Sequence, residues 1–168
     1  MFLLCVAGAA VFFDILYQKI PNGLVAAGLL GGLAYQTVCF RGQGILAYAA
    51  GVLLPVALLG ALYYFRMIGA GDIKLLAVIC GHLGPAMGLE CMIYTFLIGG
   101  AISAVLLIKR KNLFSRFFYL KTYIFQYIQT KEWSPYIRAE DQDGRFPFSI
   151  PVFGGLVITL GQGGAWRF

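Results

Sequence analysis

The stretch MIGAGDIKL, residues 67–75, decides how this chain folds. A long apolar segment ends at Phe65 and another begins at Ile73, so we expect Asp72 at or just inside a membrane boundary. An acidic side chain is costly there, which indicates a function. Gly69 and Gly71 lack a Cβ atom and permit positive φ or close backbone approach, while Asp72 is expected to cap the helix that follows.

Composition places the whole chain in a membrane. The 168 residues are 60% hydrophobic and 12% charged, with a mean hydropathy of +0.81. This is typical of an all-α polytopic membrane protein, and the length suits one membrane-embedded domain over residues 1–168. The net charge is +6, but the basic residues flank apolar segments, so no nucleic acid is expected. The four cysteines form no Cys-x-x-Cys motif, and we expect neither a metal site nor a cofactor.

The apolar segments predict a bundle of six transmembrane helices, at residues 2–17, 23–40, 45–65, 73–83, 86–108 and 146–164. Pro21 ends the first span, and residues 41–44 are expected to form a tight exposed turn. A basic amphipathic helix at about 111–132 is expected on the membrane surface. The fourth span rises only about 16 Å, so either the bilayer thins or Asp72 begins in a protein-lined recess.

The basic residues predict the orientation. If the turn after the first span is cytoplasmic, that side carries all 13 lysines and arginines except Arg41 and Arg167. The positive-inside rule then places both chain ends outside. Asp14, about one turn inside the end of the first span, falls at the same cytoplasmic level as Asp72.

Two carboxylates at one depth on different helices favour a dyad that shares a proton, because both cannot ionise cheaply at close range. One carboxylate then activates a water while the other protonates a peptide carbonyl oxygen. We expect Asp14, near an apolar wall, to hold the shared proton more strongly. Asp72 is expected to be stabilised as an anion by the helix N-terminus.

The segments DILYQKIPN, residues 14–22, and GAGDIKL, residues 69–75, resemble the paired motifs of the type IV prepilin peptidases. These are Gly-x-Gly-Asp aspartyl membrane proteases, and the short chain is most similar to their Tad/Cpa branch. The resemblance assigns catalysis to Asp14 and Asp72. It assigns substrate binding or support to Gly69, Gly71, Lys74, Pro21 and Asn22.

The resemblance implies an endopeptidase that removes the basic leader of prepilin-like precursors (Flp/Tad or pseudopilin) at the cytoplasmic face of a prokaryotic plasma (inner) membrane. The expected partners are the leader peptide and the lipid bilayer, and self-association into a homo-oligomer is left open. The zinc loop of larger, methylating relatives is missing from the sequence, so no methyltransferase activity is expected. Between Asp14 and Pro21 the chain has a single basic residue where relatives often have several.

Two other functions fit parts of the sequence. Other Gly-x-Gly-Asp intramembrane proteases usually carry a Tyr-Asp partner motif, whereas Phe13 precedes Asp14 in this chain. A small proton- or cation-coupled transporter would use the acids as a relay at the bilayer midplane between repeated halves, and no repeat is visible. Lys74 has a simpler interpretation as a snorkelling anchor, and His82 is expected to be interfacial rather than a ligand.

Overall fold

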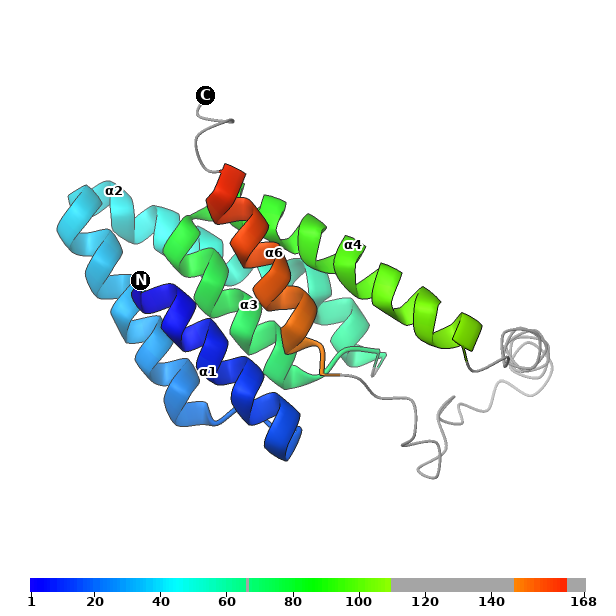
Figure 1. Cartoon of the computed structure of the whole chain (residues 1–168). Helices are drawn as coiled ribbons and strands as arrows, with labels where there is room; N and C mark the ends of the chain where they lie inside the picture. Colours follow the sequence, from blue (N-terminus) through cyan, green and yellow to red (C-terminus); the bar gives the residue numbers. More distant parts are fainter. Residues whose placement is uncertain (66, 110–146, 163–168) are drawn as a thin grey trace. The chain divides into compact units, whose positions relative to one another are not determined.

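The computed structural model of the protein describes residues 1–65, 67–109 and 147–162. These residues form the helices α1 (Phe2–Tyr17), α2 (Asn22–Tyr64), α3 (Ala70–Leu83), α4 (Pro85–Lys109) and α6 (Ser149–Gln162), as Figure 1 shows. No strand occurs in these ranges. The fold of the described residues is therefore all-α, as the composition predicts.

Three helical segments are long and apolar enough to cross a membrane: Asn22–Phe40, Gly44–Tyr64 and Pro85–Leu106. The apolar helices α1 and α6 are shorter, at 16 and 14 residues. The chain is thus a helical membrane protein. The count of six spans stays a prediction, and the interfacial helix expected at 111–132 lies outside the described residues.

Contacts divide the chain into two compact units, Met1–Gly99 with Pro147–Phe168, and Gly100–Phe146. The first unit contains α1, α2, α3, the beginning of α4 and α6. The described part of the second unit is the end of α4. All contacts discussed below lie within the first unit, and the single domain over residues 1–168 stays a prediction.

Helix α1 begins and ends where the sequence predicts. Gln18 takes a left-handed conformation (φ 50°, ψ 29°), and its N–H bonds to the carbonyl of Asp14, which closes the helix. Pro21 follows in an extended conformation as the N-cap of α2. The connection between α1 and α2 is therefore short, and it keeps the last turn of α1 next to the beginning of α2.

The sequence predicts that a turn at residues 41–44 interrupts the helix. This interruption does not occur, because α2 remains helical from Asn22 to Tyr64. The helix nevertheless folds back on itself (Figure 1). The Tyr48 hydroxyl donates to the Leu29 carbonyl at 2.8 Å, although 19 residues separate them, about 28 Å along a straight helix. Gly44 is buried at the bend, where a Cβ atom would collide with the carbonyl of Gln36. The two apolar arms of α2 therefore correspond to the second and third predicted spans.

Helix α3 lies in contact with α1, α2 and α6. Every residue from Leu75 to His82 is buried, and so is Ile73, while Lys74 is exposed. A helix that is apolar and buried on all sides belongs in a protein core. Its 14 residues extend about 21 Å, short of a bilayer core. Because other helices enclose α3, the structure favours a protein-lined recess for Asp72 rather than a thinned bilayer.

Candidate functional site

Three helix ends meet at one place in the first unit. Asp14 lies in the last turn of α1, Asp72 in the first turn of α3, and Ser149 is the first residue of α6. Oδ2 of Asp14 accepts hydrogen bonds from the Ser149 hydroxyl at 2.6 Å and from the Ser149 backbone N–H at 3.3 Å. The negative charge of Asp14 also acts on Asp72. The structure thus brings together the two acids that the sequence pairs.

Asp72 does not cap α3 in the way expected. The helix begins at Ala70, so the N-cap is Gly69 and Asp72 is the third helical residue. The backbone N–H of Asp72 donates to the Gly69 carbonyl at 3.2 Å, and the carboxylate accepts a hydrogen bond from the Gly69 backbone. This is the returning half of a capping box. The carboxylate is therefore held by the glycine that precedes it rather than by the N–H groups that follow.

The two glycines of the motif differ in what they provide. Gly69 is extended (φ −73°, ψ 146°) and Gly71 is helical, so neither uses the positive φ that glycine permits. A Cβ atom at Gly69 would lie 3.1 Å from Oδ2 of Asp72, tighter than most such contacts. A Cβ atom at Gly71 would lie 3.7 Å from Ile20, which is an ordinary contact. Space beside the carboxylate, not backbone freedom, is the reason for glycine at residue 69.

Asp72 precedes Ile73, where the predicted fourth span begins, and its side chain is partly buried. The pKa of Asp72 is raised to about 6, first by burial and then by the charge of Asp14, while the hydrogen bond from Gly69 opposes both. The two Ser149 donors and the N-terminus of α6 stabilise negative charge on Asp14. The structure therefore gives the two acids unequal environments, and which of them carries the shared proton stays a prediction.

The supporting residues of the first motif lie beside α3. The Lys74 ammonium donates to Oδ1 of Asn22 at 2.9 Å, and both side chains are exposed. The Pro21 carbonyl accepts from the N–H groups of Leu24 and Val25 at the start of α2. These contacts join the beginning of α2 to the first turns of α3. The roles in substrate binding that the resemblance gives to Lys74, Asn22 and Pro21 stay predictions.

Ser149 is the residue of this site that the sequence analysis missed. It is 0% exposed and lies between Pro147 and Pro151 at the beginning of α6. One signal could have identified it. In the predicted topology, a hydroxyl at the start of the sixth span falls at the same level as Asp14, although nothing in the sequence shows which side chain it meets.

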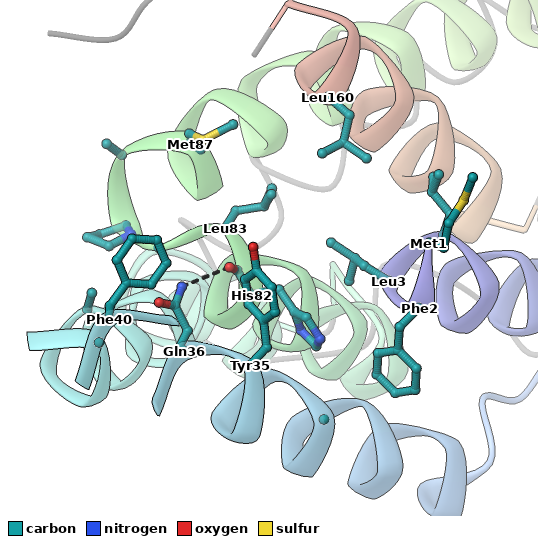
Figure 2. A pocket seen from close by; sticks show the side chains of 17 residues that line it. Met1, Phe2, Leu3, Tyr35, Gln36, Phe40, His82, Leu83, Met87 and Leu160 are labelled. Carbon is teal, nitrogen blue, oxygen red and sulfur yellow. Dashed lines mark hydrogen bonds between the residues drawn. The ribbon is translucent and has the colours of Figure 1, made fainter. Parts of the chain in front are cut away.

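A pocket of about 830 Å³ lies at the opposite end of α3 and contains neither Asp14 nor Asp72. Figure 2 shows the Gln36 amide donating to the carbonyl of His82 there, at 2.8 Å. His82 itself is buried, its Nδ1 pairs with the Val78 carbonyl at 2.9 Å, and its ring stacks on Phe2. Phe2 and α2 cover the ring, so His82 is not exposed, and its position at the level of the membrane interface stays a prediction. Larger apolar side chains contribute most of the lining: Phe2, Leu3, Phe40, Leu83, Met87 and Leu160.

The fold and the site together define a helical membrane protein with two coupled carboxylates at one end of a buried helix. The model of the type IV leader peptidase family matches residues 1–107, which include Asp14 and Asp72 but not Ser149. The chain belongs to this family and is a leader-peptidase-like protease of the membrane. The comparison with curated proteins and the comparison with solved structures each gave no match.

Proposed function

We propose that this protein is a membrane aspartyl endopeptidase that removes the leader of type IV prepilin-like precursors, of the Flp/Tad or pseudopilin kind. One observation carries the proposal. Asp14 and Asp72 lie at helix ends close enough for the charge of Asp14 to raise the pKa of Asp72, within the part of the chain that the leader peptidase family matches. A pair of carboxylates in unequal environments is the arrangement that aspartyl proteases use to divide acid from base.

In the proposed reaction, Asp14 is the base and Asp72 the acid. Asp14 takes a proton from a water, whose oxygen attacks the carbonyl carbon of the scissile peptide, while protonated Asp72 gives its proton to the carbonyl oxygen. When the tetrahedral intermediate collapses, the C–N bond breaks and Asp14 passes its new proton to the departing amine. Asp72 recovers a proton from one hydroxyl of the intermediate, so the dyad returns to its starting state.

The proposed protein has six spans in a prokaryotic inner membrane, with both ends outside and the dyad facing the cytoplasm. The distribution of basic residues supports this orientation, since only Arg41 and Arg167 of the 13 fall on the outer side in it. The proposed partners are the leader peptide and the bilayer, with a second copy of the chain as a further partner. No methyl transfer is part of the proposal.

The experiment is cleavage of a prepilin-like precursor by membrane vesicles that contain the protein. Inside-out vesicles should shorten added precursor by its leader, whereas right-side-out vesicles should not, and mass spectrometry should find a free α-amino group on the product. Vesicles with Asp14→Asn and Asp72→Asn combined provide the matched control. Cleavage by the control, or by right-side-out vesicles alone, contradicts the proposed site or its orientation.

A further inference from the structure

Ser149 contacts Asp14 with both of its donors. The hydroxyl and the backbone N–H reach the same oxygen, Oδ2, at 2.6 and 3.3 Å. The short O–H···O distance is typical of a hydrogen bond to a charged carboxylate. Ser149 is 0% exposed and stands at the first position of α6, where the helix dipole also favours negative charge. The Ser149 side of the contact is therefore enclosed by protein and fixed by a helix end, while Asp14 is half-buried.

The choice of one oxygen has a chemical consequence. A carboxylate that turns about its Cβ–Cγ bond exchanges its two oxygens, and a donor that holds one oxygen stops this rotation. With Oδ2 held by α6, Oδ1 is the oxygen that remains to accept a proton from water. The Asp14 carboxylate then has one orientation rather than several. Its charge also affects the charge state of Asp72.

We propose that Ser149 is a positioning residue for Asp14: its hydroxyl holds Oδ2 and thereby presents Oδ1 to the attacking water. The proposal rests on the proposed protease function, and it gives a role to a helix beyond the segment that the family comparison matches. Ser149 does not itself touch the substrate in this proposal. It acts through the geometry of Asp14 alone.

The kinetic test compares three variants on a precursor with measured kcat and KM. Ser149→Ala removes the hydroxyl but keeps the backbone donor, so kcat should fall about tenfold with KM nearly unchanged. Ser149→Thr retains the hydroxyl and should restore most of kcat. Thr159→Val is the matched control, because Thr159 is also buried on α6 but its hydroxyl bonds to the Gly155 carbonyl of the same helix and to Cys91 of α4, away from Asp14.

The kinetic result overturns the proposal if Ser149→Ala lowers kcat no more than Thr159→Val does. It also overturns the proposal if Ser149→Ala acts on KM alone, since orientation of a catalytic carboxylate belongs to the chemical step. All variants are compared per amount of folded, membrane-inserted protein. This normalisation separates a loss of folded protein from a loss of catalytic rate, in Ser149→Ala and in the control alike.

A second measurement does not need activity. Purified protein in detergent is treated at one fixed pH with a water-soluble carbodiimide and an amine, and labelling of Asp14 is quantified by peptide mapping, with Asp72 as the internal reference. Ser149→Ala should increase labelling of Asp14 about threefold or more, and Ser149→Thr should return it to the wild-type level. Unchanged labelling overturns the proposed contact. If labelling responds but the wild type cleaves no precursor, the proposed function fails while the Ser149–Asp14 contact stands.

Discussion

The two ends of α3 hold polar side chains in different ways. At the His82 end, the imidazole bonds to a carbonyl of its own helix, and the Gln36 amide bonds to the His82 carbonyl. At the Asp72 end, a partly buried acid meets a second acid, Asp14, whose charge raises the pKa of Asp72. In the first arrangement, backbone carbonyls pair with Nδ1 of His82 and with the Gln36 amide, while Nε2 of His82 is buried with no hydrogen-bond partner among the described residues. The second arrangement leaves a proton to be shared, and that is what acid–base chemistry requires.

In the proposed function, the cavity does not mark the place of the chemistry. The pocket of about 830 Å³ lies at the His82 end, where its lining is mainly apolar. The coupled carboxylates lie at the other end, beside an exposed rim formed by Lys74 and Asn22. A site for an extended peptide needs an accessible edge more than a deep cavity. Four predictions test this contrast between the two ends.

The largest effect is expected from the dyad. Asp14→Asn and Asp72→Asn should each lower leader cleavage by about 10³-fold or more, because each removes one of two proton transfers. The double variant should be no worse than either single variant, as expected for residues that act as a unit. His82→Gln, at the other end of α3, is the control and should keep activity within about threefold per folded protein. Substantial cleavage by either single Asp variant, purified and inserted, would reject the dyad.

The second effect is on stability. The pKa of Asp72 is raised from 3.8 to about 6, so the folded state binds this proton more tightly than the unfolded state. The resulting stabilisation is complete below pH 3.8 and is lost as the pH rises through 6. Relative to Asp72→Asn, the wild type should therefore lose up to about 3 kcal/mol between pH 4 and 7. Unfolding in detergent at several pH values measures this loss.

A matched variant tests the cause of that loss. In an Asp14→Asn background, the loss should move to lower pH, because the charge of Asp14 raises the pKa of Asp72. An unchanged transition would mean that the two acids are not coupled. A difference between wild type and Asp72→Asn that does not vary with pH would reject the raised pKa itself.

The third prediction distinguishes the role of Gly69 from that of Gly71. Gly69→Ala places a Cβ atom 3.1 Å from Oδ2 of Asp72 and should lower kcat about tenfold, because the carboxylate must shift. Gly71→Ala meets only Ile20 at ordinary contact distance and should keep activity, with a gain in stability of up to about 1 kcal/mol from helix propensity. Precursor cleavage and thermal unfolding measure the two effects. Equal loss of cleavage in both variants would show that the substrate, not Asp72, requires the glycines.

The smallest effect is expected at the exposed rim. Lys74→Ala removes a hydrogen bond to Asn22 and should cost less than about 1 kcal/mol of stability, because both groups are exposed. Asn22→Ala should cost the same, and the double variant should cost no more than either alone. Loss of all cleavage in Lys74→Ala, with stability unchanged, would instead give Lys74 a direct role with the substrate.

Local features of the sequence account for much of the fold. The bounds of α1 and the end of α3 at Leu83 agree with the prediction, because helix ends depend on nearby residues such as Pro21, Gly84 and Pro85. The reversal of α2 agrees with the turn predicted at residues 41–44, but the unbroken helix there does not follow from such features. The chain stays helical through residues 41–44 and doubles back, and the contact between Tyr48 and Leu29 exists only because the two arms pack together.

The sequence by itself determined that the protein is helical and membrane-embedded, and it predicted Asp14 and Asp72 as the acid pair. Those conclusions depend on apolar length, charge distribution and two short motifs, all of which are local. Tertiary structure alone decided that Ser149 holds Asp14 and that the two acids lie in unequal environments. Asp14 and Ser149 are 135 residues apart, so their hydrogen bond has no signature in either segment. The burial, nearby charges and hydrogen bonds of a carboxylate depend on groups from distant helices, and only tertiary packing determines which groups these are.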